Sequence, residues 1–582
     1  MSTSVSKPIV RCIKDNKEEL DIFESSLKNE DEKTQEIIRD FPTVYIHNWQ
    51  NTDNYEVYVG ESNNIFQRTR EHYSDAKNVN NWQNKLLNND AKLYIIGHEH
   101  FNKSLTLDVE NRLIHYLMSI ENVHHVHNLR GNPQGKYYTS EELDVIFRKR
   151  WRELRKENSN LFPTESTIKD SAIYKASPLH KLTREQEEAR ELIIQRVTNA
   201  LSLDERGQLI FVEGEAGTGK TVLNSSTFYE LYCRAEEQKK PIDCYLLVNH
   251  DEQITVYEQI ADKLGLTEKY GKVVSKPTTF INNHSIDKPV DVVFVDEAHL
   301  LLTQGKQSYQ GNNQLKDIID RARVVVVMFD ENQVLTTEQF WEAEQLEKYR
   351  ERALKEDNHI VLSKQLRMQA DPLTIDWIDA FTKEGKIKSI PRNVDYTITV
   401  CDSPIVLDEA IRKKAGDEKT ALSRVIATYD WEYSSNHKPE DRLKKYWEVM
   451  IGDWHKPWNR ELEDELSKKD KRRIKGLSWA EQPQTINEVG STFTIQGFDL
   501  NYAGVILGPS VKYREGRIIF DPNESSNEKA IRNRTLSDGS KKKFGELLLK
   551  HEVRVLMTRG VNGMYIYACD KELREALKKA MV

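Results

Sequence analysis

A glycine-rich stretch at residues 214–221, which reads GEAGTGKT, carries the clearest chemistry in this sequence. It follows an apolar run and precedes a helical pattern, the order that is typical of a strand, a phosphate-binding loop and a helix. Backbone N–H groups in such a loop turn toward phosphate oxygens at the helix N-terminus. Lys220 would meet the β- and γ-phosphates, and the Thr221 hydroxyl would bind Mg²⁺. The stretch therefore predicts ATP binding by Gly214, Glu215, Ala216, Gly217, Thr218, Gly219, Lys220 and Thr221.

Two acidic residues at the end of a second apolar run predict the metal side of the same site. Residues 291–299 read DVVFVDEAH, so Asp296 and Glu297 follow a run with the composition of a buried parallel strand. We expect Asp296 to hold Mg²⁺ through water and Glu297 to polarise the attacking water. The site is therefore expected to hydrolyse ATP as well as to bind it.

A separate group of polar and aromatic side chains lies nearer the start of the chain. Two short strands joined by a polar turn are predicted at 43–46 and 56–60. A helix should follow through 61–73, and a second at about 105–120, before a loop at 127–133. Candidate chemical side chains recur on these elements: Tyr45, Tyr58, Arg68, His72, Glu110 and Asn128. Tyrosines that only pack as cross-strand pairs are the structural alternative.

This segment resembles a GIY-YIG endonuclease domain, with Thr43-Val44-Tyr45 and Tyr58-Val59-Gly60 in the places of the two tripeptides. The resemblance implies phosphodiester hydrolysis, with Glu110 binding one Mg²⁺, or Mn²⁺ as an alternative, and Arg68 stabilising the phosphate. Tyr45 would act as general base, although a free tyrosine has a pKa of about 10. Tyr58 and His72 would orient water and phosphate, and Asn128 matches a late asparagine of the family. Thr43 replaces the usual glycine, which leaves an inactive nuclease open as an alternative.

From about residue 180 onward the sequence resembles superfamily 1 helicases. The wording ATYDW, FTIQGFDLNYAGVILG and VLMTRGVNGMYIYAC resembles the bacterial Schlafen-group-3-like helicase family. The resemblance implies that Gln186 reads the adenine edge and that Gln333 senses the γ-phosphate. It also implies that Arg367 and Arg559 reach that phosphate from across a cleft, and that Thr494, Gln496 and Gly497 contact nucleic acid or phosphate.

These elements predict an α/β chain: two RecA-like, doubly wound parallel-sheet motor lobes preceded by a small α/β GIY-YIG nuclease domain. The expected divisions are an arm at 1–40, the nuclease domain at 41–138, a basic helical linker at 139–176, lobe 1 at 177–345 and lobe 2 at 346–582. Lobe 2 is expected to carry insertions at about 380–420 and 434–480. The second insertion contains Trp447, Trp454, Trp458 and Trp479 beside basic residues, and we favour core anchoring over base stacking for them.

Composition restricts the setting. None of the apolar stretches in the 582 residues reaches about 18, and the N-terminus lacks an apolar signal core, so a cytoplasmic protein without a membrane partner is expected. Five scattered cysteines fit a reducing compartment. The net charge of −8 means that nucleic acid must bind in grooves. Local basic runs exist, and charge reversal at Arg148, Lys149 and Arg150 is predicted to weaken DNA affinity.

The sequence therefore predicts an ATP-dependent helicase or translocase with a metal-dependent endonuclease, acting on single-stranded or forked DNA. Bacterial antiphage defence, restriction or repair is the setting that such a fusion implies. Three alternatives stay open: an ATP-controlled conformational or assembly switch, an RNA-directed enzyme, and a motor whose nuclease is inactive. The residues leave oligomerisation open as well.

Overall fold

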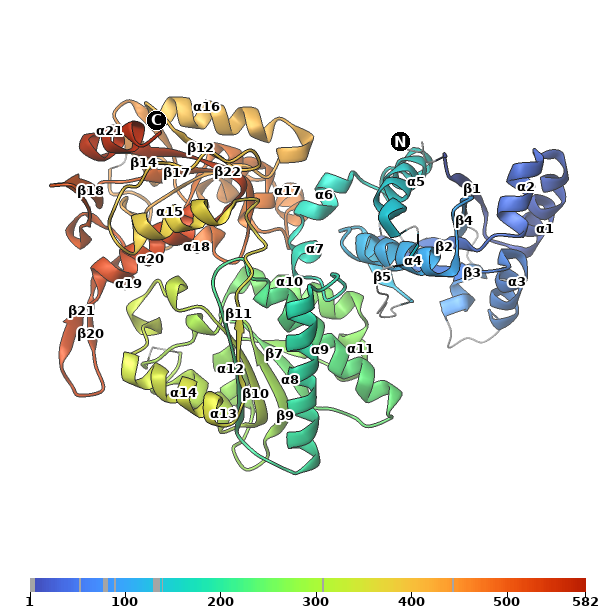
Figure 1. Ribbon diagram of the computed structural model, residues 1–582, viewed down its shortest axis with the longest axis horizontal. Coiled ribbons are helices and arrows are strands. Elements are labelled where there is room, and N and C mark those ends of the chain that lie inside the picture. Colours follow the sequence, from blue (N-terminus) through green and yellow to red (C-terminus); the bar gives the residue numbers. More distant parts are fainter. Residues whose placement is uncertain are drawn as a thin grey trace. The chain divides into compact units, whose positions relative to one another are not determined.

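The computed structural model describes residues 6–51, 54–76, 82–87, 90–128, 137–138, 140–305, 308–441 and 444–581. The chain divides into two compact units (Figure 1). The first unit comprises Met1–Lys181 with Tyr257–Lys272, and the second comprises Leu182–Val256 with Val273–Val582. Among the described residues, no helix is long and apolar enough to cross a bilayer.

The first unit is built on a five-stranded mixed sheet with the order β1-β4-β2-β3-β5. All neighbours are antiparallel except β3 and β5. Its strands are β1 (Ile9–Lys14), β2 (Thr43–Asn51), β3 (Asn54–Ser62), β4 (Lys92–Gly97) and β5 (Val123–Val126). Its main helices are α1 (Lys17–Ser26), α2 (Glu32–Arg39), α3 (Ile65–Asp75), α4 (Lys103–Met118), α5 (Leu143–Glu157), α6 (Glu165–Asp170) and α7 (Ala172–Ala176).

The segment expected as a separate arm is part of this domain. Strand β1 forms the edge of the sheet by pairing with β4, and Leu20 and Leu27 are fully buried in the core. Helices α1 and α2 begin after Asn16 and Asp31, which each cap the first turn with their side chains. Residues 6–40 therefore belong with the domain that was expected to begin at residue 41.

Helix α5 contradicts the expectation that Arg150 lies on a DNA-binding face. Arg150 is 1% exposed, and its guanidinium lies 3.8 Å from the ring centroid of Phe101. Within the described part of the chain, none of its side-chain nitrogens has a hydrogen-bond partner, and burial lowers its pKa well below the ordinary value. Of these three residues, Arg148 and Lys149 keep solvent access.

Arg150→Glu is therefore expected to destabilise the protein by about 3–5 kcal/mol, because it buries a carboxylate without a partner. Urea unfolding of the full chain measures this effect. Arg148→Glu makes the same charge change on the exposed face of α5 and should leave the midpoint nearly unchanged. Equal midpoints for the two variants would contradict the burial of Arg150.

The second unit contains two parallel sheets, the first with the order β11-β6-β10-β9-β7-β8. Its strands are β6 (Gln208–Gly214), β7 (Cys244–Leu247), β8 (Val274–Ser275), β9 (Val290–Val295), β10 (Ala322–Phe329) and β11 (His359–Leu362). Helices α8 (Arg184–Ser202) and α9 (Lys220–Glu237) cover one face, and α13 (Gln314–Ile319) and α14 (Ala343–Lys355) cover the other (Figure 1). After β7 the chain enters α10 (Asp251–Lys263), whose later part belongs to the first unit together with α11 (Leu266–Tyr270), and α12 (Pro277–Asn283) then follows β8 in the second unit. Because β11 pairs with β6, the first lobe continues beyond the boundary expected at 345.

The second parallel sheet has the order β12-β22-β17-β13-β16. Its strands are β12 (Thr397–Val400), β13 (Arg424–Ala427), β16 (Val489–Gly490), β17 (Leu500–Leu507) and β22 (Gly560–Ala568). Its helices are α15 (Pro372–Thr382), α16 (Pro404–Ala415), α17 (Lys468–Arg473), α18 (Thr492–Ile495), α19 (Glu528–Ile531), α20 (Gly545–Met557) and α21 (Lys571–Lys579). Three antiparallel hairpins complete it: β14 (Glu448–Ile451) with β15 (Trp454–Pro457), β18 (Val511–Arg514) with β19 (Arg517–Phe520), and β20 (Asn533–Thr535) with β21 (Lys541–Lys543).

The two segments expected as insertions differ in kind. Residues 380–420 supply β12 to the sheet and α16 to its core, where Leu407 and Ile411 are fully buried, so they belong to the lobe itself. Residues 434–480 form the β14–β15 hairpin and short helices beside the sheet. Trp458 and Trp479 are both 0% exposed, which confirms that these two tryptophans are core anchors.

Candidate ATP site, nuclease site and nucleic-acid groove

The phosphate-binding loop has the backbone that its glycines predict. Gly217 and Gly219 have φ angles of +88° and +80°, a region that residues with a Cβ rarely adopt. A Cβ at Gly217 would lie 2.6 Å from the Cβ of Arg367, and one at Gly219 would lie 2.1 Å from Nε2 of Gln186. The loop ends at the first turn of α9, so its N–H groups and a helix N-terminus form a cradle that fits phosphate.

Lys220 lies at the floor of this cradle and is 7% exposed. Its Nζ donates hydrogen bonds to the carbonyl oxygens of Gly214 (2.5 Å) and Glu215 (2.9 Å) and lies 3.6 Å from Oδ2 of Asp330. Thr221 follows in the first turn of α9, half-buried. A cation, a hydroxyl and the loop backbone therefore meet where nucleotide phosphates and their magnesium ion would bind.

Asp296 and Glu297 follow β9 and are both buried. Glu297 has φ of +47°, an uncommon backbone for a non-glycine residue, which turns the chain sharply after the strand. Burial alone would raise the pKa of Glu297, but interactions with His299 and Lys220 lower it below the ordinary value. Glu297 is therefore ionised at neutral pH and can accept a proton from water.

Gln186 braces the loop in this structure. Its Oε1 accepts from the backbone N–H of Thr183 as half of a capping box, and its Nε2 donates to the carbonyl oxygens of Thr218 (3.3 Å) and Gly219 (3.4 Å). The side chain thus lies against the phosphate loop, at the start of α8. Its role in reading adenine stays a prediction.

An ion pair and two hydrogen bonds lead from the phosphate loop to the second lobe. Asp330, beside Lys220, accepts from Nε2 of Gln333 at 2.7 Å. Oε1 of Gln333 accepts from Nη2 of Arg559 at 2.8 Å. Arg559 is 0% exposed, and burial together with the nearby Arg367 lowers its pKa to about 9, so that it stays charged at neutral pH. The structure therefore brings Gln333 and Arg559 together behind the cradle.

Arg367 reaches the loop from the segment that follows β11. Its Nε lies 2.5 Å from Oδ1 of Asp499 in the second lobe, and the neighbouring Leu366 N–H donates to the carbonyl oxygen of Gly217 at 2.7 Å. Gln496 donates from Nε2 to the carbonyl oxygen of Gln333 at 3.1 Å. The residues expected to sense the γ-phosphate therefore lie within one connected network.

Two members of this network were not predicted. Asp330 is buried at the end of β10 and joins Lys220 to Gln333. Arg554 on α20 donates to Oε2 of the loop residue Glu215 at 2.7 Å and pairs with Asp379. Arg554 lies five residues before Arg559 in the sequence, and this spacing was the signal from which a role for Arg554 could have been predicted.

The candidate nuclease residues converge on strands β2 and β3 and helices α3 and α4. The register pairs Tyr45 with Gly60, where an added Cβ would lie 2.5 Å from the Tyr45 hydroxyl. The glycine of the second tripeptide therefore makes room for the tyrosine of the first. Thr43 is fully buried, and its hydroxyl donates to the carbonyl oxygen of Ser62 at 3.4 Å, so threonine is accommodated at that position.

Tyr45 and His72 form a buried phenol–imidazole pair, with the hydroxyl 3.0 Å from Nε2. Burial and the nearby Tyr58 raise the pKa of Tyr45, whereas burial and the nearby His47 lower the pKa of His72 to about 3. His72 is therefore neutral near pH 7. Arg68, one helical turn before His72, interacts with Tyr45 and donates to Glu71 at 3.0 Å.

Glu110 and Asn128 form a second buried pair of this domain. Nδ2 of Asn128 donates to Oε1 of Glu110 at 2.8 Å and to the carbonyl oxygen of Val59 at 2.7 Å, which ties α4 to β3. The remainder of the loop expected at 127–133 lies outside the described residues. In the part of the chain described, no three His, Cys, Asp or Glu side chains gather as a metal cluster. A divalent ion here would therefore rest on Glu110, with phosphate and water oxygens completing its coordination.

Sequence reasoning missed three neighbours of this cluster. Asp15, from the supposed arm, pairs with His47 at 2.6 Å, and both side chains are fully buried. His47 is packed edge-on against Tyr45 and His72. Trp82 stacks on Tyr58 with ring centroids 4.1 Å apart. Alternation along β2 puts His47 on the face of Tyr45, but the pairing with Asp15 depends on tertiary structure.

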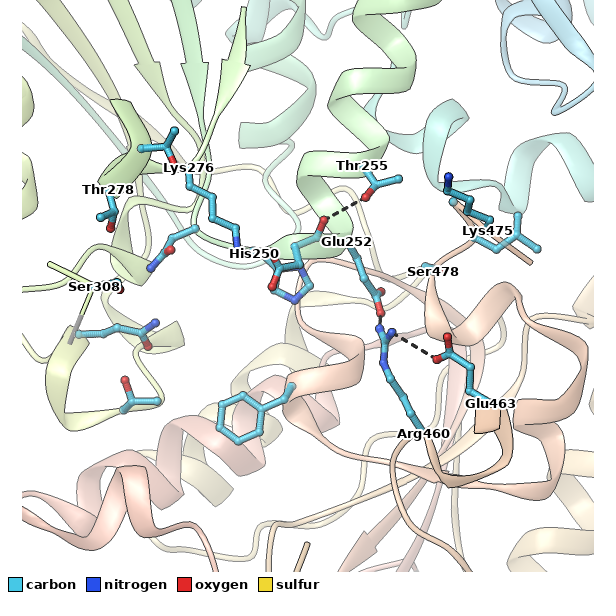
Figure 2. A pocket seen from close by; sticks show the side chains of 18 of the residues that line it. His250, Glu252, Thr255, Lys276, Thr278, Ser308, Arg460, Glu463, Lys475 and Ser478 are labelled. Atoms are coloured by element: carbon cyan, nitrogen blue, oxygen red, sulfur yellow. Dashed lines mark hydrogen bonds and ion pairs between the residues drawn. The ribbon is translucent and has the colours of Figure 1, made fainter. Parts of the chain in front are cut away.

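A groove of about 1030 Å³ lies between the two lobes of the second unit (Figure 2). Lobe 1 contributes the loop after β7 and the starts of α10 and α12, and lobe 2 contributes the segment 460–482 with Phe493 and Lys529. Hydroxyl, amide and basic side chains recur on its walls, among them Asn249, Thr255, Thr278, Ser478, Lys475 and Lys529. Such donors suit a phosphate backbone.

The family model that matches this chain is a helicase model, and the residues it matches include the candidate nucleotide site. The family model for the Schlafen group 3, DNA/RNA helicase domain matches residues 207–570. The uncharacterized protein YPL245W of Saccharomyces cerevisiae is 33% identical over 433 residues, which cover 68% of this chain and 90% of that protein. This yeast relative shows that such chains are not confined to bacteria.

Two solved structures show remote similarity. The Pif1 helicase of Candida albicans is 16% identical, with a TM-score of 0.22 over 40% of this chain and 55% of that chain. A Pif1 structure described as unwinding forked double-stranded DNA by two coordinating helicases is 12% identical, with a TM-score of 0.24 over 68% of this chain and 94% of that chain. The family assignment therefore rests on the family model and the yeast relative. On that basis, the chain belongs to the Schlafen group 3 DNA/RNA helicase domain family.

Proposed function

We propose that this chain is an ATP-driven helicase or translocase that acts on single-stranded or forked DNA. The observation that carries the proposal is the continuous network from Lys220 through Asp330 and Gln333 to Arg559. Because Lys220 belongs to one lobe and Arg559 to the other, a change at the phosphate cradle is transmitted directly to the position of lobe 2.

In the proposed hydrolysis step, Glu297 accepts a proton from the attacking water while Lys220 neutralises charge on the phosphates. Thr221 and Asp296 would hold Mg²⁺, which supplies further charge neutralisation at the phosphates. Arg559 and Arg367 would turn from Gln333 and Asp499 toward the γ-phosphate when ATP is bound. Loss of that phosphate would return Arg559 to Gln333 and alter the groove between the lobes.

The test is ATP hydrolysis by the full chain with single-stranded DNA, forked DNA, single-stranded RNA or no nucleic acid, together with strand separation of the fork. Stimulation by DNA and ATP-dependent separation are expected. Hydrolysis that is indifferent to nucleic acid would favour an ATP-controlled switch. Stimulation by RNA alone would identify an RNA-directed enzyme.

A second activity, metal-dependent endonuclease cleavage, is favoured by two groups of side chains, Tyr45 with Arg68 and His72, and Glu110 with Asn128. Tyr45 would act as the general base toward water, hydrogen-bonded to the neutral His72. A metal ion at Glu110 and the cation of Arg68 would lower the raised pKa of the Tyr45 hydroxyl. Glu110 would bind Mg²⁺ or Mn²⁺, which supplies Lewis-acid chemistry at the phosphate, and Arg68 would stabilise the charge that develops there.

A nuclease joined to a DNA motor suits restriction of invading DNA, such as antiphage defence, or DNA repair. Survival of a host that expresses the chain, measured after phage infection and after DNA damage, separates these settings. Loss of the effect in a variant without ATP hydrolysis is expected in either setting.

A further inference from the structure

The groove between the lobes is crossed by an ion pair. Arg460, which follows the β14–β15 hairpin in lobe 2, pairs with Glu252 in the first turn of α10 on the lobe 1 side. A second carboxylate, Oε2 of Glu463, lies 3.8 Å from Nη1 of Arg460. Figure 2 shows the guanidinium between these two acids, within the groove.

The segment that carries Arg460 is firmly anchored. Trp458 is fully buried two residues earlier, and Asn459 has φ of +62°, which turns the chain toward the groove. Nε1 of Trp479 donates to the carbonyl oxygen of Asn459 at 3.0 Å, while the backbone N–H of Trp479 donates to Glu252 at 3.3 Å. The tryptophans of the 434–480 segment therefore hold Arg460 at a fixed point on the groove wall.

The groove neutralises much of its own charge. Five lysine or arginine side chains and four carboxylates line it, so its cations are nearly balanced by its acids. Lys276 is also paired with a carboxylate, that of Asp251, as Arg460 is paired with that of Glu252. Arg460 keeps 38% of its side chain exposed, whereas Glu252 keeps 12%, so the arginine is the partner that an incoming phosphate can reach.

We propose that Arg460 is a phosphate-binding residue for single-stranded DNA and that Glu252 is the carboxylate with which the DNA backbone competes. The proposal rests on the proposed DNA motor and assigns a role in it to the segment 434–480. Without DNA, the pair joins lobe 1 to lobe 2 across the groove. When a strand enters, a phosphate takes the guanidinium from Glu252 and releases that connection between the lobes. Entry of the strand thereby frees the lobes to move during ATP hydrolysis.

The experiment measures binding of a fluorescein-labelled oligothymidylate to the full chain by anisotropy across a range of salt concentrations. Glu252→Gln keeps an acceptor for the Trp479 N–H but removes the competing charge, so affinity should rise by about three- to tenfold. Arg460→Gln should lower affinity by a similar factor and reduce the salt slope by about 0.7. The double variant should bind like Arg460→Gln, because Glu252 acts through Arg460.

Glu465→Gln is the matched control, because it removes one negative charge nearby from a residue that does not line the groove. The affinity of this variant should stay within a factor of two of wild type, which is a change of about 0.4 kcal/mol or less, as expected for a surface substitution. Affinity that is unchanged or lower in Glu252→Gln, while wild type binds DNA and the variant melts normally, would overturn this inference alone. Absence of DNA binding by wild type would overturn both the inference and the proposed motor.

Discussion

Lys220→Ala is expected to lower the rate of ATP hydrolysis by about a thousandfold or more. The substitution removes the cation at the floor of the phosphate cradle and leaves the buried carboxylate of Asp330 without the ammonium 3.6 Å away. Negative charge would then face the incoming phosphates, so ATP binding should weaken together with hydrolysis. Phosphate release in the steady state and titration with a fluorescent ATP analogue measure the two effects.

Glu297→Gln separates binding from chemistry at the same site. The amide keeps the shape of the side chain but cannot accept the proton of the attacking water, so hydrolysis should fall about a hundredfold or more while ATP binding is retained.

For Lys220→Ala, the matched control is Lys240→Ala, which removes an exposed lysine after α9. Hydrolysis at the wild-type rate by Lys220→Ala would show that residues 214–221 are not the catalytic nucleotide site.

Local motifs explain why the backbone of the candidate nucleotide site follows from the sequence. The positive φ angles of Gly217 and Gly219 and the start of α9 at Lys220 follow from eight consecutive residues. Asp296 and Glu297 come directly after a strand whose apolar run is visible in the sequence. In each case the residues that set the geometry are neighbours along the chain, so spacing alone is informative.

Tertiary context decided the features that the sequence did not predict. Strand β1 has six residues and becomes a sheet edge only by pairing with β4, some 80 residues later. Arg150 belongs to a basic run, but the turn of α5 that carries it faces Phe101. Residues 380–420 match no motor motif, yet β12 joins the second sheet and α16 packs in its core. Burial of this kind depends on partners far away in the sequence, which composition does not reveal.

The nuclease cluster lies between these two cases. The resemblance named six residues, and the structure places Tyr45, Arg68 and His72 together on one side and Glu110 with Asn128 on the other. The sequence did not predict that His72 would be a neutral hydrogen-bond partner of Tyr45, since that depends on burial. The substitution Glu110→Gln tests whether this cluster cuts DNA.

Glu110→Gln is expected to reduce cleavage of labelled single-stranded, duplex or forked DNA in Mg²⁺ by at least about a hundredfold. Glutamine keeps an oxygen that can accept from Asn128, so the tie between α4 and β3 should survive while the charge that would hold the metal is lost. Cleavage by gel electrophoresis, repeated with Mn²⁺, measures the effect. Glu36→Gln makes the same change on an exposed helix face of the same unit and should cut like wild type.

Lys220→Ala in the same assay distinguishes a coupled nuclease from an independent one. If the motor feeds DNA to the nuclease, this variant should still cut but lose its response to ATP, because Glu110 and Tyr45 remain intact. Because the pKa of His72 is about 3, the pH profile of cleavage between 7.5 and about 6 should show no inflection near 6.5, where an ordinary histidine gains its proton. Equal cutting by wild type and Glu110→Gln would place the nuclease elsewhere. No cutting by wild type, with DNA-stimulated ATP hydrolysis intact, would make the Tyr45 cluster a binding module and the chain a motor alone.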